Sequence, residues 1–179
     1  GFFGVNERGH VCVRPRDDDR ELELDVIDVV EAARRDERIS LPMLIRFQDI
    51  IRSRVRRIDQ RFQEAIRSAG YRNRYRGIYP VKVNQLQEVV AEVLEAGREF
   101  GMGLECGSRA ELMAALPLVA DEHLLLCNGV KDRSMLEMML DAQRLGQQVL
   151  PIIEKYTEFE QLMGLAGDGE PAPIVGVRV

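Results

Sequence analysis

"GMGLECGSRAELMAALPLVADEHLLLCN", residues 101–128, decides the fold of this chain. The apolar runs at its two ends, 101–106 and 123–128, have the length of buried strands, and the segment between them has the length of a helix. Two parallel strands need a long connection, which is usually a helix. The stretch therefore predicts a strand, a helix and a second strand parallel to the first.

The same alternation continues from Leu41 to the end of the chain. We expect strands at 41–47, 76–83, 101–106, 123–128, 148–154 and 173–179, with helices at 47–69, 86–98, 109–119, 133–145 and 158–166. Capping boxes are expected at Ser108 with Glu111 and at Thr157 with Glu160, and helix C-caps at Gly70 and Gly146. This spacing is typical of an α/β fold, either a (β/α)8 barrel or a doubly wound sheet.

The first 40 residues do not follow this alternation. "GFFGVNERGHVCVRP", residues 1–15, predicts a β-hairpin that turns at 6–9 and stops at Pro15. Residues 16–40 are expected to form a helical connection. We therefore divide the chain into a hairpin (1–15), a connection (16–40) and the first part of a barrel (41–179), which is too short to close.

Composition favours a globular protein. Of the 179 residues 45% are hydrophobic, and the net charge of -5 disfavours a general nucleic-acid binder. The segment 52–76 is rich in arginine and could be a nucleic-acid patch, but its apolar residues recur at helical spacing, which favours a solvated helix face.

The cysteines and the hydropathy pattern point to the cytoplasm. Cys12, Cys106 and Cys127 have no metal-ligand spacing, and three widely spaced cysteines do not suggest a disulfide framework. No apolar run approaches the ~18 residues of a membrane span, and we expect no leader peptide. The chain lacks an initiator Met and is expected to be part of a longer protein.

Each expected strand from the second onward ends in a polar residue on one face. Because side chains alternate along a strand, Lys82, Glu105, Asn128, Glu154 and Arg178 are expected at the same end of the sheet, where a barrel has its active site. The alternative is that charges occur at strand ends simply because loops begin there. Gly101 and Gly103 precede Glu105 on the same face of the expected strand and would leave space there for a bulky group. The alternative is that these glycines form a turn at the start of the strand.

Lys82 lies in "GIYPVKVNQ", residues 77–85. Lysine is rare in this chain: of its 25 Lys and Arg residues, only Lys82, Lys131 and Lys155 are lysines. A buried amine loses its proton more readily than a guanidinium and can attack a carbonyl. Schiff-base formation with an aldehyde cofactor would explain this lysine. A lysine that snorkels from a strand end is the alternative.

Five motifs closely resemble the biosynthetic arginine decarboxylases, which are fold-type III pyridoxal-phosphate enzymes with an alanine-racemase-like TIM barrel. They are "GFFGVNERGHVCV" (1–13), "RYRGIYPVKVNQ" (74–85), "GLECGSRAEL" (103–112), "CNGVKDR" (127–133) and "IVGVRV" (174–179). The resemblance implies that the hairpin belongs to a separate β domain completed by a distant part of the protein.

The resemblance also implies a reaction and a site. The full-length protein would convert L-arginine to agmatine and carbon dioxide for polyamine biosynthesis, as a cytoplasmic homo-oligomer, and family members often need magnesium. Lys82 and Glu105 would be catalytic, with Lys82 bound covalently to pyridoxal phosphate. Arg178 would approach the cofactor's phenolic oxygen, and Glu105, Glu111 and Asn128 would also bind the cofactor. Glu111 is equally the natural capping partner of Ser108.

Two other functions remain open. The substrate could be ornithine, lysine or diaminopimelate, because the residues that select it lie mostly outside this chain. The protein could also be a non-catalytic paralogue. The family's ring-stacking histidine, phosphate loop and partner-subunit cysteine have no counterpart before Val179, and neither His10 nor His123 lies in a matching motif. We expect the fragment alone to be inactive.

Overall fold

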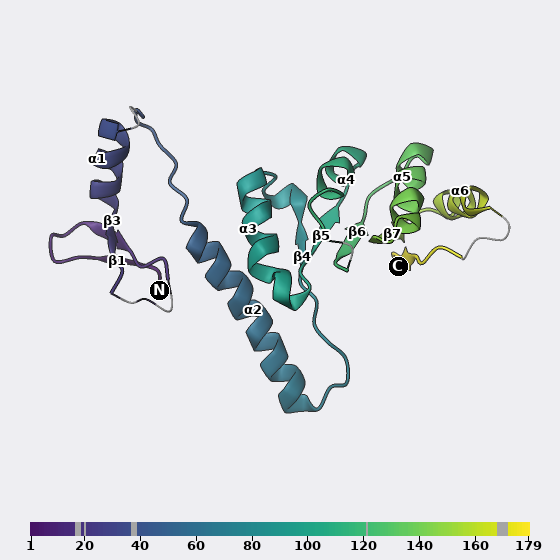
Figure 1. The fold of residues 1–179 in the computed structure, drawn as a ribbon, viewed down its shortest axis with the longest axis horizontal. Helices are drawn as coiled ribbons and strands as arrows, with labels where there is room; N and C mark the ends of the chain where they lie inside the picture. Colours follow the sequence, from purple (N-terminus) through teal and green to yellow (C-terminus); the bar gives the residue numbers. More distant parts are fainter. Residues whose placement is uncertain (17–18, 20, 37–38, 121, 168–171) are drawn as a thin grey trace. The chain divides into compact units, whose positions relative to one another are not determined.

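The computed structural model describes residues 1–16, 19, 21–36, 39–120, 122–167 and 172–179 (Figure 1). The chain forms two compact units, Gly1–Ile58 and Asp59–Val179, which are described separately. Residues 17, 18, 20, 37 and 38 of the expected connection lie outside the described residues. The division at residues 15 and 40 stays a prediction.

The first unit contains the predicted hairpin. Strand β1 (Phe3–Val5) pairs antiparallel with β2 (Val11–Val13), with Phe3 opposite Val13. A short strand β3 (Leu24–Asp25), which the sequence analysis did not predict, adds to the free edge of β2. Helix α1 (Val26–Asp36) follows directly. The hairpin prediction is confirmed, and it extends to a three-stranded antiparallel sheet.

The expected strand at 41–47 is wrong. These residues form no strand or helix in the structure, and Leu41 and Leu44 are exposed. A strand needs a neighbour to complete its backbone hydrogen bonds, and no described segment lies beside this one as a strand. The pattern of apolar residues was therefore insufficient to predict a strand here.

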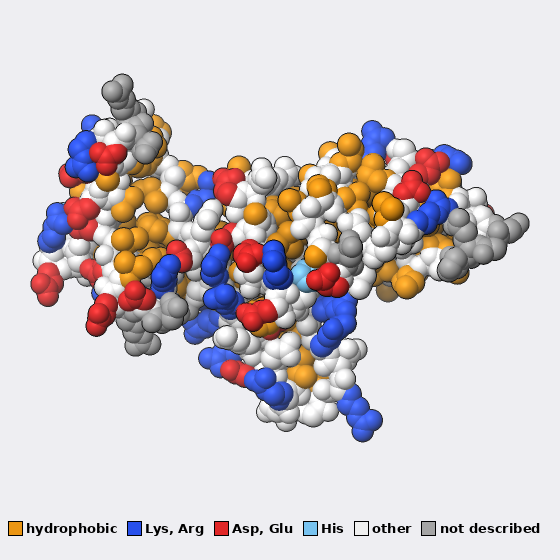
Figure 2. Space-filling view, in the orientation of Figure 1, with side chains coloured by type: hydrophobic (Ala, Val, Ile, Leu, Met, Phe, Trp, Pro, Cys, Tyr) orange, Lys and Arg blue, Asp and Glu red, His pale blue; other side chains and the backbone are white. Residues whose placement is uncertain are grey.

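The arginine-rich segment begins in a long helix, as predicted. Helix α2 (Gln48–Ala69) buries Val55 and leaves five arginines exposed, Arg54, Arg56, Arg57, Arg61 and Arg67. Along this helix Figure 2 shows arginine side chains mixed with acidic and uncharged ones. Ile58 and Phe62 of the expected apolar stripe are exposed as well, so the stripe is only partly covered. The arginines lie on the solvated side, as expected.

The second unit contains a five-stranded parallel sheet in the order β4-β5-β6-β7-β8. Its strands are β4 (Ile78–Pro80), β5 (Gly103–Cys106), β6 (Leu124–Cys127), β7 (Gln148–Ile153) and β8 (Gly176–Val177). The connecting helices are α3 (Gln87–Gly97), α4 (Arg109–Ala115), α5 (Arg133–Arg144) and α6 (Tyr156–Ala166). The predicted α/β class with a parallel sheet is confirmed, and neighbouring strands follow in chain order, as in a barrel.

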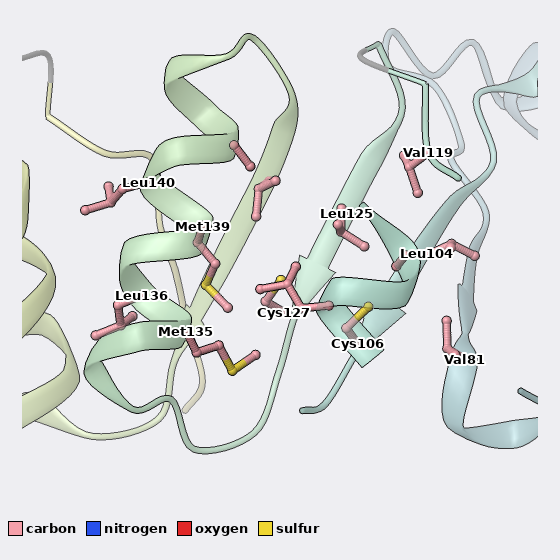
Figure 3. Close-up of a cluster of buried hydrophobic side chains, with 14 of the residues drawn as sticks. Val81, Leu104, Cys106, Val119, Leu125, Cys127, Met135, Leu136, Met139 and Leu140 are labelled. Carbon is pink, nitrogen blue, oxygen red and sulfur yellow. The ribbon is translucent and has the colours of Figure 1, made fainter. Parts of the chain in front are cut away.

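The hydrophobic core lies between this sheet and its helices (Figure 3). Alternate strand residues such as Leu104, Cys106 and Leu125 are fully buried and belong to the same hydrophobic cluster as the helix residues Leu136 and Met139. Residues of the opposite face, such as Leu126, are only half-buried. Alternation along each strand therefore directs one set of side chains to the helices and the other set to the face that carries the polar strand ends.

The glycines below Glu105 do not open space for a ligand. A Cβ on Gly103 would lie 2.0 Å from the carbonyl oxygen of Leu124, so this glycine allows β6 to approach β5 closely. Gly101 has φ +75 and ends the short 3-10 helix Arg98–Phe100. The turn alternative is therefore correct for Gly101, whose positive φ ends the 3-10 helix, while Gly103 is required by the close approach of the Leu124 backbone.

Candidate active site

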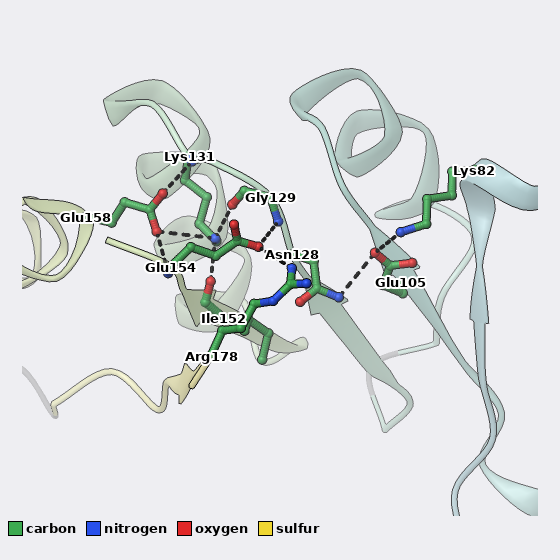
Figure 4. Close-up of polar contacts among 9 residues, drawn as sticks. All are labelled: Lys82, Glu105, Asn128, Gly129, Lys131, Ile152, Glu154, Glu158 and Arg178. Atoms are coloured by element: carbon green, nitrogen blue, oxygen red, sulfur yellow. Dashed lines mark hydrogen bonds and ion pairs between the residues drawn. The ribbon is translucent and has the colours of Figure 1, made fainter. Parts of the chain in front are cut away.

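Lys82 lies directly after strand β4, in the 3-10 helix η1 (Val81–Val83). The sequence analysis placed it within the strand, and this is a correction: pairing with β5 ends at Pro80, which is opposite Glu105. The side chain of Lys82 is 61% exposed, so its amine is open to solvent in this chain. A single turn after the strand directs the lysine toward the sheet face that the helices do not cover (Figure 4).

Glu105 receives two donors on one oxygen. Its Oε1 lies 3.3 Å from Lys82 Nζ and accepts a hydrogen bond of 3.2 Å from Asn128 Nδ2. The carboxylate is 9% exposed and stands on β5 between the strands that lead to its two partners. Glu105 therefore fixes the lysine and the amide relative to each other.

An open hollow of about 430 Å³ lies over this face of the sheet. It is lined by Ile78, Pro80, Lys82, Glu105, Leu126, Asn128 and Arg178. The family resemblance assigned five residues to the site, and four of them, Lys82, Glu105, Asn128 and Arg178, line this hollow. Their chemical roles stay predictions.

Glu111 is the fifth, and its carboxylate caps a helix. Glu111 Oε2 accepts a 2.7 Å hydrogen bond from the backbone N–H of Gly107, and Ser108 Oγ accepts one of 3.3 Å from the N–H of Glu111. The predicted cap at Ser108 is confirmed. Glu111 does not line the hollow, although Gln85 Nε2 donates to its Oε1 at 3.3 Å. A cofactor-binding role for Glu111 stays a prediction.

Arg178 is oriented by Glu154, which the strand-end pattern placed at this end of the sheet but to which the family resemblance gave no role. Its NH1 lies 3.2 Å from Glu154 Oε1, which also accepts the backbone N–H of Gly129 at 2.9 Å. The Gly129 N–H and then the Arg178 guanidinium hold the pKa of Glu154 below its usual value, against the effect of burial. Glu154 is therefore ionised at neutral pH and pairs with a guanidinium at the edge of the hollow.

A buried ion pair lies behind Glu154, and sequence reasoning missed it. The side chains of Lys131 and Glu158 are 0% and 3% exposed, and Lys131 Nζ lies 3.5 Å from Glu158 Oε2. Burial alone would raise the pKa of Glu158, but the N–H groups of Glu154 and Lys131 and the Lys131 ammonium outweigh it, and the pKa is lowered. The scarcity of lysine that singled out Lys82 was equally a signal for Lys131.

The expected cap at Thr157 is wrong, because α6 begins at Tyr156, before Thr157. Glu158, in the first turn of α6, supplies the capping carboxylate: its Oε2 accepts the backbone N–H of Glu154, which precedes the helix, at 3.0 Å. The S/T-x-x-E pattern therefore matched two residues after the true N-cap, Lys155, and Glu158 is the residue that holds the start of α6.

Other reactive groups of the chain lie away from the hollow. Cys106 and Cys127 face the helices, and burial raises the pKa of both thiols, that of Cys127 to about 12. His123 is buried, and His10 pairs with Asp25 in the first unit. Within the described ranges, no three His, Cys, Asp or Glu side chains are grouped as metal ligands would be. Among the same residues, no helix is long and apolar enough to cross a bilayer.

The hollow combines an exposed primary amine, a guanidinium and hydrogen-bonding groups above an apolar floor. An amine condenses with an aldehyde, and a guanidinium binds anionic oxygens. These residues fit pyridoxal phosphate, whose ring carries an aldehyde beside a phenolic oxygen. Lys82 could hold its aldehyde carbon, and Arg178 one of its oxygens.

Comparison with known proteins points to the same chemistry. Residues 51–179 match the family model described as "Pyridoxal-dependent decarboxylase, pyridoxal binding domain". The biosynthetic arginine decarboxylase of Prochlorococcus marinus (strain MIT 9313) is 44% identical over 99% of this chain and 27% of that protein. The enzyme of the same name from Rhodopirellula baltica is 38% identical over 100% of this chain and 26% of that protein.

A solved structure shares the fold. The crystal structure of the biosynthetic arginine decarboxylase of Campylobacter jejuni superimposes with a TM-score of 0.84 at 28% identity, over 98% of this chain and 28% of that one. The chain thus spans about a quarter of the length of the relatives it matches. The predicted barrel architecture is confirmed. The chain belongs to the pyridoxal-dependent decarboxylases, and its residues 51–179 match their pyridoxal-binding domain.

Proposed function

We propose that the full-length protein decarboxylates L-arginine to agmatine and carbon dioxide with pyridoxal phosphate as cofactor. The observation that carries this proposal is that the relatives similar to the whole chain are named biosynthetic arginine decarboxylases. The hollow that contains Lys82, Glu105 and Arg178 supports it, because its side chains suit this cofactor.

Each residue of the hollow has a role that follows from its contacts. Lys82 is the covalent attachment point, since its amine is exposed beside the sheet. Glu105 holds that amine in place through Oε1, and Asn128 holds the same oxygen from the next strand. Arg178 binds an anionic oxygen of the cofactor. Bound pyridoxal phosphate supplies an electron sink for the electron pair left when a carboxylate departs as carbon dioxide.

Three further expectations belong to the whole protein. It acts in polyamine biosynthesis, it works in the cytoplasm, and it forms a homo-oligomer. A magnesium requirement is a family expectation that no described metal-ligand cluster of this chain explains.

The test is expression of the complete reading frame and an assay of carbon dioxide and amine release. Arginine, ornithine, lysine and diaminopimelate are offered separately, with added pyridoxal phosphate and with or without magnesium. Arginine is expected to give the highest kcat/KM, and Lys82→Ala is expected to abolish turnover. Preference for another amino acid would replace the substrate proposal. Cofactor binding without turnover of any of the four would favour the non-catalytic paralogue.

A further inference from the structure

The buried carboxylate of Glu158 joins the loops that follow two neighbouring strands. Its Oε1 accepts the backbone N–H of Lys131, in the loop after β6, at 3.0 Å. Its Oε2 accepts the backbone N–H of Glu154, in the loop after β7, at 3.0 Å. One rigid side chain therefore sets the spacing between these two loops (Figure 4).

The ammonium of Lys131 joins the same two segments through their carbonyls. Its Nζ donates to Gly129 O and to Ile152 O, both at 2.5 Å. Glu158 Oε2, at 3.5 Å, is the third oxygen beside the ammonium and its ion-pair partner. A buried ion pair is seldom more stable than packed apolar residues of the same size. Stability alone therefore does not explain why a lysine and a glutamate lie in this core.

The fixed loops present Glu154 to Arg178. The backbone N–H of Glu154 donates to the Glu158 carboxylate. Oε1 of Glu154 in turn accepts the backbone N–H of Gly129, and the carbonyl of Gly129 accepts a hydrogen bond from Lys131 Nζ. The same Oε1 lies 3.2 Å from Arg178 NH1. Arg178 is 67% exposed, so a preset carboxylate restricts a side chain that would otherwise adopt many rotamers. An unbroken chain of contacts thus runs from the buried pair to the hollow.

We infer that Lys131 and Glu158 are positioning residues for Arg178, which they orient through Glu154 so that its guanidinium is ready to bind the cofactor. The inference rests on the proposed function, in which Arg178 binds pyridoxal phosphate. It predicts that Glu158 affects cofactor binding only by way of Arg178.

A double-mutant cycle in the full-length protein tests this coupling. The apo-protein and its variants Glu158→Gln, Arg178→Lys and the double variant are titrated with pyridoxal phosphate. The dissociation constant and the absorbance spectrum of the bound cofactor are recorded, together with Tm. Glu160→Gln is the matched control, because it makes the same change at an exposed position of the same helix.

Glu158→Gln is expected to weaken cofactor binding about five-fold, as the loss of one ordinary hydrogen bond would, and to change the absorbance spectrum. The Arg178→Lys protein is expected to bind equally weakly with either residue at 158, while Glu160→Gln leaves binding unchanged. A purely structural role would lower Tm and give effects that multiply in the double variant, and that result would overturn the inference.

Glu154→Gln provides a second cycle if Glu158→Gln does not fold. Glu154 is only partly buried, with a side chain 21% exposed, and it contacts Arg178 directly. Glu154→Gln is expected to weaken cofactor binding when residue 178 is arginine and to have no effect on it when residue 178 is lysine. If the two substitutions weaken cofactor binding independently, the inference is contradicted. The readout is cofactor binding, so a wild-type protein that binds pyridoxal phosphate but does not decarboxylate arginine would refute the proposed function alone.

Discussion

Lys82 Nζ lies 3.3 Å from Glu105 Oε1, although the two residues are 23 positions apart in the sequence. The parallel register that sets Pro80 opposite Glu105 brings them together, and the 3-10 turn after Pro80 supplies the direction of the lysine. Because Asn128 holds the same oxygen from the neighbouring strand, the amine is tied to the centre of the sheet rather than to its own loop.

Lys82 is expected to carry the cofactor in the full-length protein. Borohydride reduction followed by peptide mapping should find a pyridoxyl group on Lys82. Lys131 should remain unlabelled, because its side chain is 0% exposed and its ammonium is engaged by two carbonyls and Glu158. Lys155 is exposed and serves as an internal control for non-specific labelling. A label on Lys131 or Lys155 in place of Lys82 would contradict the assignment.

Glu105→Ala is expected to weaken pyridoxal phosphate binding about five-fold. The reason is the loss of an ion pair worth roughly 1 kcal/mol that keeps Lys82 over the hollow. Titration of the apo-protein with pyridoxal phosphate measures the change. Glu88→Ala, on the exposed side of α3, is the matched control and should bind as the wild type does. Equal binding by the Glu105 variant would show that Lys82 needs no such support.

Gly129→Ala is expected to destabilise the protein. Gly129 has φ +76, and a Cβ there would lie 2.5 Å from the carbonyl oxygen of Gly107. Strain at such a position costs about 1–3 kcal/mol, which should lower Tm. Gly164→Ala is the control, because Gly164 lies in α6 with open space around it. There alanine should stabilise by about 0.5–1 kcal/mol. If both substitutions change Tm in the same direction, backbone strain at Gly129 is not what determines the effect.

The thiols of Cys106 and Cys127 are expected to react slowly with iodoacetamide at pH 8. The thiolate is the reactive form, and burial raises the pKa of both groups, that of Cys127 from 9.0 to about 12. A raised pKa means less thiolate at pH 8, so labelling should keep increasing as the pH rises beyond 9. Mass spectrometry of native and denatured protein compares the rates. Equal rates in the two states would show that these thiols are not buried.

Local pattern determined most of the second unit. Apolar runs separated by amphipathic segments predicted β4 to β8 and α3 to α6, because a buried parallel strand must be apolar and its crossover must bury one helix face. The period of two also predicted that Lys82, Glu105, Asn128 and Arg178 would share one face, and all four line the hollow. For Lys82 the position was right but the reason was not, because the 3-10 turn after β4 directs this side chain. The resemblance to a known family, and not the pattern, identified the cofactor.

Tertiary structure decided what local pattern could not encode. The segment 41–47 is apolar enough for a strand, yet a strand exists only where a partner completes its hydrogen bonds. Lys131 and Lys82 are both lysines that follow strands, and only the packing of α6 makes the first a buried partner of Glu158 while the second stays open. Distances between distant residues, such as Arg178 to Glu154, depend on strand register and loop spacing, which arise only when the sheet and its helices pack together.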